Sequence, residues 1–216
     1  MNSGLVPAVL LVGVLSGCSS ESEPDSPADG GKASAKPAAK GESPAAQGEG
    51  TPVAKQAGTV GGTGSPCALP VSFDLAAGWK PQAVKDDPTF GLTKQGPVTL
   101  VCEIDAKPAG NIGFIRVWTE AAGHTDPRAA LEAFVAKETA SRDKVAYTQT
   151  KAGQFAATEV TYVNTDEVLD APKNERAFAL KTPKGLVVVH LGGLDNEEHK
   201  GMLPAYELAK KSVRAA

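Results

Sequence analysis

The sequence predicts an α+β fold, in which two helices pack on a curved antiparallel β-sheet. Apolar and polar side chains alternate in several short segments between residues 66 and 216, which is typical of half-buried strands. Apolar residues at helical spacing occur twice, once after Asp126 and once near the C-terminus. The helices therefore bracket the later strands, an order that is typical of α+β proteins with helices packed on a sheet.

Strands are expected in seven segments, of which the last is the clearest. Phe178 and Leu180 alternate with smaller or polar neighbours, and residues 186–189 form a Val-rich run. Because this run is apolar on both faces, it should be a central strand. The expected strands cover residues 71–75, 79–84, 98–104, 111–119, 154–164, 175–181 and 186–191.

Both expected helices have an apolar face. In the first, Asp126 is the expected N-cap and Pro127 the first helical residue, because aspartate accepts hydrogen bonds from free backbone amides and proline has none to lose. The second helix is expected over residues 204–214, where basic side chains near its end suit the helix dipole. The apolar faces consist of Leu131, Phe134 and Val135, and of Met202, Tyr206, Ala209 and Val213.

The N-terminus resembles a bacterial lipoprotein signal peptide. Residues 5–15 carry no charge, and they are too few to span a bilayer core, which needs about 20 residues. They have the length of a signal-peptide apolar region. Residues 15–18 match the lipobox of lipoprotein precursors: an aliphatic residue, two small residues and Cys18. The resemblance implies cleavage before Cys18 and anchoring through its lipid to the outer face of a membrane. The alternative is an ordinary signal peptide with a chance cysteine.

Residues 19–65 differ in composition from the rest of the chain. Ala, Gly, Pro, Ser, Lys and Glu dominate this segment, which has no aromatic residue. Such a segment buries too little apolar surface to offset its ordering entropy, so a disordered tether is expected. The predicted organisation is therefore a signal peptide (1–17), a lipidated cysteine with its linker (18–65) and a globular domain (66–216). A phosphate-loop interpretation of glycines 58–64 lacks the flanking strand, helix and Lys-Ser/Thr pair.

Residues 73–79 run Phe-Asp-Leu-Ala-Ala-Gly-Trp, similar to the Phe-x-aliphatic-Pro-x-Gly-Trp opening of PsbP-like domains. Together with the order of elements, this opening resembles the actinobacterial LpqN/LpqT-type lipoproteins over about residues 68–215. Ala76 stands where those domains usually have proline. The resemblance implies a PsbP-like fold and a role as a binding or assembly factor rather than an enzyme.

Three cysteines are present, and assigning Cys18 to lipid leaves a pair. Cys67 and Cys102 are expected to form a structural disulfide, because an exported protein occupies an oxidising compartment. The alternative, a redox or metal-binding pair, usually requires close spacing such as Cys-x-x-Cys, which this pair lacks.

The three histidines offer few catalytic options. His124 is expected in a loop, and His190 is interpreted as a strand-end side chain rather than a base. His199 ends the polar segment 195–199, where Asp195 and Glu198 are typical of a helix cap and its partner. Metal binding by this segment is the alternative, but it lacks the His-Glu-x-x-His spacing that places two imidazoles on one helical face.

No catalytic motif stands out in the domain. The Gly-x-Ser-x-Gly motif is absent, and the acidic pairs at 86–87 and 166–167 are interpreted as solvated turns. Trp79 and Trp118 are expected as core residues, with a ligand groove as the alternative. Neither a metal site nor a cofactor is predicted, and a net charge of −3 does not favour nucleic acid.

The predicted function is that of a lipid-anchored extracytoplasmic lipoprotein. Its partners are expected to be the membrane, through Cys18, and an envelope protein or a small apolar ligand, bound without catalysis. The alternative is an envelope hydrolase whose residues converge from separate loops. A third possibility is a purely structural domain spaced from the membrane by the tether.

Overall fold

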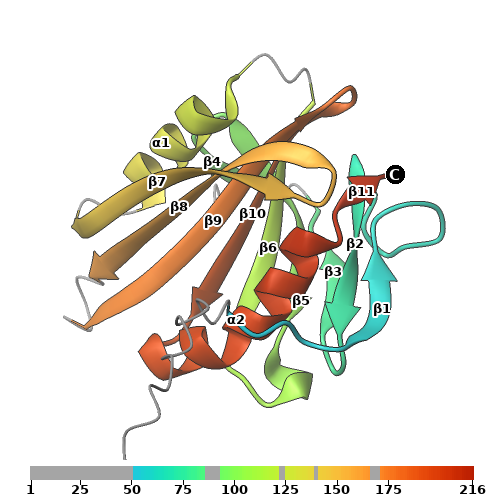
Figure 1. The fold of residues 1–216 in the computed structure, drawn as a ribbon, viewed down its shortest axis with the longest axis horizontal. Helices are drawn as coiled ribbons and strands as arrows, with labels where there is room; N and C mark the ends of the chain where they lie inside the picture. Colours follow the sequence, from blue (N-terminus) through green and yellow to red (C-terminus); the bar gives the residue numbers. More distant parts are fainter. Residues whose placement is uncertain (1–50, 86–92, 122–124, 139–140, 166–170) are drawn as a thin grey trace, which may run out of the picture. The chain divides into compact units, whose positions relative to one another are not determined.

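The computed structural model describes residues 51–85, 93–121, 125–138, 141–165 and 171–216. The predicted signal peptide, Cys18 and residues 19–50 of the predicted tether lie outside the described residues, as do His124 and the acidic pairs at 86–87 and 166–167. The described part contains an antiparallel sheet with two packed helices, which confirms the predicted α+β class (Figure 1).

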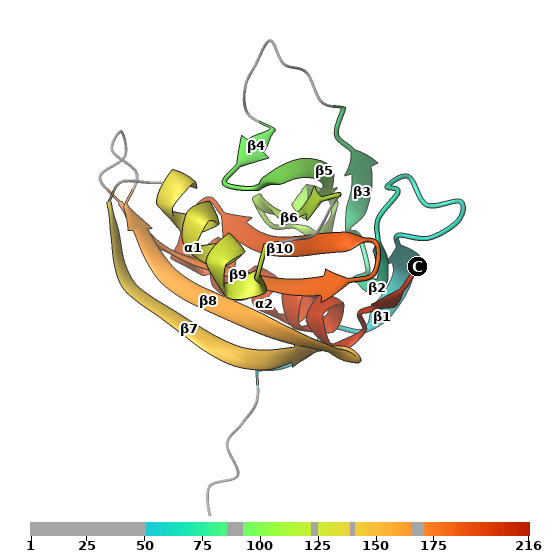
Figure 2. The ribbon, with the colours of Figure 1, turned by 90° about the horizontal axis from the view of Figure 1, so that it is seen from above.

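The main sheet is antiparallel throughout and bends strongly at its β7–β8 end (Figure 2). In spatial order it contains β3 (Lys80–Ala83), β5 (Val98–Asp105), β6 (Gly113–Glu120), β10 (Gly185–Gly193), β9 (Pro172–Thr182), β8 (Phe155–Thr165) and β7 (Arg142–Ala152), while β4 (Lys94–Gln95) pairs with β5. All nine residues of β10 are buried, so the Val-rich run is a central strand as predicted.

The two helices cover opposite faces of this sheet. Helix α1 (Pro127–Glu138) packs against β8 and β9, and α2 (Asn196–Lys211) packs against β10, β9 and a neighbouring strand, β2 (Val71–Ala76). Side chains alternate along β10, so that Val188 joins the core under α1 while Val187 and Val189 join the core under α2. His190 follows the same alternation and faces Phe134 of α1, with ring centroids 5.5 Å apart. No helix in the described part of the chain is long and apolar enough to cross a membrane.

The helix starts show one confirmed and one wrong prediction. Asp126 caps α1, where its carboxylate accepts the Arg128 backbone N–H at 2.9 Å. Helix α2 begins at Asn196, eight residues before the predicted start at Pro204. The Asp195 carboxylate accepts the amides of residues 197 and 198, so it caps this long helix rather than a short separate turn. Pro204 lies inside the helix, and its carbonyl accepts a hydrogen bond from Ala54.

The predicted boundary between tether and domain is also wrong. Strand β1 (Gln56–Val60) pairs with β2, whose other edge pairs with β11 (Arg214–Ala215). Val60 is the only large apolar residue in β1 and is fully buried, so the Gly-rich composition concealed the strand. Gly61 has φ +81°, and a Cβ there would lie 2.0 Å from the Val71 carbonyl oxygen. This glycine therefore serves a tight strand connection.

The edge strand β7 was not predicted. Its side chains are mostly exposed and polar, and they do not show the alternation that marks a half-buried strand. It is held by its pairing with β8, from Ala152 opposite Phe155 to Arg142 opposite Asn164. The remaining short element is a 3₁₀ turn, Lys107–Ala109.

The predicted disulfide is present. Cys67 and Cys102 are bonded with their Cα atoms 5.7 Å apart, and both are fully buried. The bond joins the segment before β2 to β5. Trp79 and Trp118 are buried in the two cores, as expected, and Trp118 packs edge-on against Phe134 with ring centroids 5.3 Å apart.

Candidate functional site

A cavity of about 530 Å³ opens where β10 ends, beside the first turn of α2. Its wall combines apolar side chains with a small group of charged ones. The apolar part includes Ile112, Phe114, Pro172 and Leu194, and the charged part includes Arg116, Glu138, Lys173, Glu175 and His190. This size and mixture are typical of sites for small ligands.

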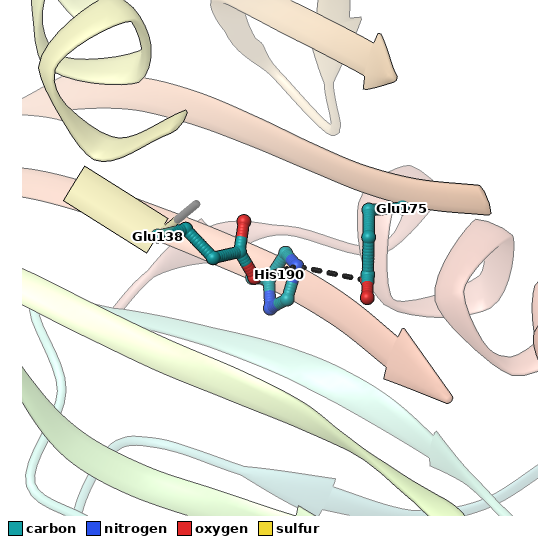
Figure 3. A group of neighbouring side chains, drawn as sticks. All are labelled: Glu138, Glu175 and His190. Atoms are coloured by element: carbon teal, nitrogen blue, oxygen red, sulfur yellow. Dashed lines mark ion pairs between the residues drawn. The ribbon is translucent and has the colours of Figure 1, made fainter. Parts of the chain in front are cut away.

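Four elements bring together the polar side chains around His190. His190 lies on β10 and Glu175 lies on the adjacent strand β9. The residue of β9 that pairs with His190 is Ala177, and Glu175 is two residues before it. Tyr162 of β8 is paired directly with Glu175. Glu138 is the last residue of α1 and approaches from above the sheet. Figure 3 shows the two carboxylates on either side of the His190 ring. We call Glu138, Tyr162, Glu175 and His190 the histidine cluster.

The contacts in the histidine cluster converge on one nitrogen. His190 Nε2 lies 3.1 Å from Glu175 Oε2 and 3.5 Å from Glu138 Oε1. The Tyr162 hydroxyl lies 3.4 Å from the same nitrogen and donates a hydrogen bond to Glu138. Lys173 Nζ lies 3.1 Å from Glu175 Oε1 and donates a hydrogen bond to the Gly193 carbonyl. Three oxygens therefore surround a nitrogen that can donate at most one proton.

Burial and charge act in opposite directions on the pKa values of these groups. Burial alone would lower the pKa of His190, but the carboxylates of Glu138 and Glu175 outweigh it and raise that pKa above its usual value. Burial alone would raise the pKa of Glu175, but His190 and Lys173 outweigh it and lower that pKa. Burial, together with the negative charge of Glu138, raises the pKa of Tyr162 well above its usual value. The cluster thus favours positive charge at the imidazole.

A second cavity of about 550 Å³ lies next to the first and shares Glu175, Asn196 and Glu197 with it. His199, in the first turn of α2, lines this second cavity and is buried. Its Nδ1 has no hydrogen-bond partner, and burial lowers the pKa of His199 to about 4. His199 is therefore neutral near pH 7, and it is buried although it ends a polar segment of the sequence.

The sequence did not indicate the histidine cluster. His190 was interpreted as a strand-end side chain, whereas the structure places it, buried, between two carboxylates. The available signal was a histidine within an apolar strand, together with Glu175 on the strand before it. The segment 195–199 does form the predicted cap at Asp195, and Glu198 accepts the Ile112 amide at 2.9 Å.

Among the described residues, Glu138, Glu175 and His190 could hold a metal ion, because one ligand atom from each lies within 4.8 Å of the others.

Comparison with known proteins gives one result. A search of curated proteins finds no match. A family model described as "Uncharacterised lipoprotein" matches residues 35–213, which covers the region that holds the cavity and the histidine cluster. Because this match extends over most of the 216 residues, the chain belongs to that lipoprotein family.

Proposed function

We propose that this lipoprotein is anchored by lipid on Cys18 at the extracytoplasmic face of a membrane, and that its domain binds a small, partly apolar ligand without catalysis. Two observations support the lipidation: the chain belongs to a lipoprotein family, and residues 15–18 resemble a lipobox. The resemblance of residues 68–215 to PsbP-like, LpqN/LpqT-type lipoproteins supports a binding role. The remaining support comes from the cavity.

The apolar mouth of the cavity is the observation that carries the ligand proposal. Four large apolar side chains in the described part of the chain are exposed: Val53, Ile112, Val145 and Leu194. Two of them, Ile112 at 56% and Leu194 at 52% exposure, line this one cavity and are joined by a backbone hydrogen bond of 3.0 Å. Adjacent exposed apolar side chains beside a cavity are typical of a binding site.

The described residues of the cavity wall lack the nucleophile of serine, threonine and cysteine hydrolases. Such enzymes require a nucleophilic hydroxyl or thiol beside a base. His190 does have carboxylate neighbours, but no Ser, Thr or Cys is found among the described residues that line the cavity.

Titration with the uncharged fluorescent dye N-phenyl-1-naphthylamine tests the ligand proposal. The dye should bind saturably, because its rings can displace water from the apolar mouth. Ile112→Lys and Leu194→Lys should each weaken binding about tenfold, which corresponds to about 1.4 kcal/mol. Val145→Lys, at an exposed valine on β7 that does not line the cavity, is the matched control and should bind as wild type. Failure of the wild-type protein to bind, or equal binding by all variants, would refute the proposed ligand site.

The anchor is tested separately by intact mass spectrometry of membrane-extracted protein. The wild-type mass should correspond to a chain that starts at Cys18 and carries acyl groups. The Cys18→Ala variant should lack these groups and leave the membrane fraction, because two acyl chains are needed for stable anchoring. Wild-type protein that retained residues 1–17 without lipid would contradict the anchor.

A further inference from the structure

We propose that Glu138, Glu175 and His190 form a site for one divalent transition-metal ion of the zinc type, open to the cavity (Figure 3). This inference deepens the proposed function, because the ion would occupy the wall of the same ligand cavity. One imidazole nitrogen and two carboxylate oxygens are ligands that Zn²⁺ and related ions accept.

The spacing of the three ligand atoms fits such an ion. Zinc binds nitrogen and oxygen at about 2.0–2.2 Å, so two ligands at a tetrahedral angle lie about 3.3 Å apart. His190 Nε2 lies 3.1 Å from one carboxylate oxygen and 3.5 Å from the other. The ligand atoms of the three residues all lie within 4.8 Å of one another, so a closing movement of at most about 1.5 Å would bring three donors around one ion.

The buried Glu175 Oε2 faces His190 Nε2 at ion-pair distance, a position that a cation could take. The Glu175 side chain is only 1% exposed, and its Oε1 contacts Lys173. Its Oε2 is buried and has no hydrogen-bond partner, although it lies 3.1 Å from His190 Nε2. Buried charges are normally paired or bound to metal, because an unpaired carboxylate loses its hydration. An ion between Oε2 and Nε2 would satisfy both atoms.

The charges around the site leave a place for positive charge. Glu138 and Glu175 supply two negative charges, and Lys173 supplies one positive charge. Arg116, opposite His190 on β6, is already paired with Glu103 at 2.7 Å. Glu138 also ends α1, where the helix dipole disfavours an acidic side chain, so helix stability does not explain its position. The resulting net charge of −1 can be offset either by a proton on His190 or by a divalent cation bound to neutral His190.

The surrounding backbone leaves the ion accessible. All three ligands line the cavity, so a fourth position faces its interior and can take water or a donor atom of a bound ligand. A Cβ at Gly192 would lie 3.1 Å from His190 Cε1 and 3.5 Å from Glu175 Oε2, so the glycine keeps this space free. The site thus resembles an open metal centre rather than a closed structural one.

The alternative to a bound metal ion is a proton on His190, which would then pair with Glu138 and Glu175. Calorimetric titration of chelator-stripped protein with ZnCl₂ distinguishes metal binding from this protonated state. The full chain is used without a histidine tag and with Cys18→Ala, so that neither a tag nor that thiol binds zinc. One equivalent of Zn²⁺ should bind with a Kd of about 10 μM or below. No binding below about 100 μM would overturn the proposal without any variant being needed.

Variants then locate the ion. Glu138→Gln and His190→Gln should each weaken zinc binding at least tenfold, since each removes one of three ligands. Two matched controls should bind as wild type: His199→Gln, at a second buried histidine, and Glu132→Gln, at an exposed glutamate on α1. Circular dichroism verifies that each variant is folded. Equal zinc binding by wild type and the ligand variants would overturn the assignment of the site.

Co²⁺ provides a readout besides affinity. Wild-type protein with bound Co²⁺ should show the strong visible absorption of a tetrahedral ion, and Glu138→Gln should lose it. The weak absorption of an octahedral ion would contradict the proposed geometry. These titrations contain no organic ligand, so dye binding by a protein that binds no metal would leave the proposed function intact. Conversely, metal binding without dye binding would refute only the apolar ligand.

Discussion

Two buried polar clusters lie on opposite faces of the same sheet and differ in how completely their charges are paired. On the α2 face, Lys210 contacts Glu159 and Glu207, each at 3.0 Å. Arg176 contacts Glu207 at 3.1 Å, and the Tyr206 hydroxyl donates to Glu159 at 3.0 Å. We call these five residues the lysine network. Its two cations balance its two carboxylates, although the buried Arg176 Nε has no hydrogen-bond partner.

The histidine cluster on the α1 face has a different balance. Its two carboxylates share Lys173 and an imidazole whose charge depends on a proton or a metal ion, and Glu175 Oε2 has no hydrogen-bond partner. It also lines a cavity of about 530 Å³, whereas none of the residues of the lysine network lines that cavity. We therefore expect the lysine network to contribute to stability and the histidine cluster, which lines the cavity, to contribute to the proposed binding.

The largest expected effect comes from breaking the lysine network. Lys210→Met should lower the free energy of unfolding by about 3–5 kcal/mol, because it leaves Glu159 and Glu207 buried without their shared cation. Urea denaturation measures this loss. The control is Lys211→Met at the next, exposed position, which should change stability by less than about 0.5 kcal/mol. A small effect at Lys210 would mean that the network does not stabilise the fold.

Zinc binding to the histidine cluster is expected to change the free energy of unfolding by a smaller amount. Zinc at a hundredfold excess over its Kd should raise the free energy of unfolding by about 2.7 kcal/mol, because it binds the folded chain. Lys210→Met should keep this increment, since the lysine network is on the other face of the sheet. His190→Gln should lose it. An increment that persisted in His190→Gln would contradict the proposed difference between the two clusters.

The sequence predicted the elements around these clusters better than the clusters themselves. The Val-rich run of β10, the Asp126 cap and the Cys67–Cys102 disulfide depend on local patterns or cysteine number, and the structure confirms all three. Helix α2 was placed too late because Pro204 resembled a first helical residue, although Asp195 had already supplied a cap. Strand β1 was missed because a single buried valine carries its apolar signal.

The histidine cluster could not be predicted from local patterns, because it depends on long-range pairing. Tyr162 and Glu175 are brought together by the register of β8 and β9, and His190 is joined to them by the register of β9 and β10. Glu138 reaches them only because α1 crosses that face of the sheet. Each residue alone is compatible with an ordinary surface or strand position.

His199, which lines the second cavity, should give a pH-dependent effect of intermediate size. Its neighbours include Glu175, Arg176, His190 and Lys173, and burial lowers its pKa from 6.5 to about 4. The unfolded chain therefore binds more protons than the folded chain between these pH values, so stability falls as pH falls from 6.5 to 4. With allowance for solvent screening, the loss should be about 1–2 kcal/mol.

Urea denaturation in chelator at pH 7 and pH 4.5 measures this effect. Between these pH values the free energy of unfolding of wild type should fall by about 1–2 kcal/mol more than that of His199→Gln. The other titrating groups are the same in both proteins, so their contributions cancel in this difference. Parallel losses in the two proteins would show that His199 carries no such penalty.

The smallest effect is expected at an exposed ion pair on the same helix as Glu138. Arg128 Nε lies 2.7 Å from Glu132 Oε1, four residues further along α1, and both side chains are about half exposed. Water and salt screen such a pair, so Glu132→Gln should lower the free energy of unfolding by only about 0.3–0.5 kcal/mol and should leave zinc binding unchanged. If Glu132→Gln lowered the free energy of unfolding as much as Lys210→Met, buried and exposed charge pairs would contribute equally to stability. The contrast between the paired network and the open cluster would then have no physical basis.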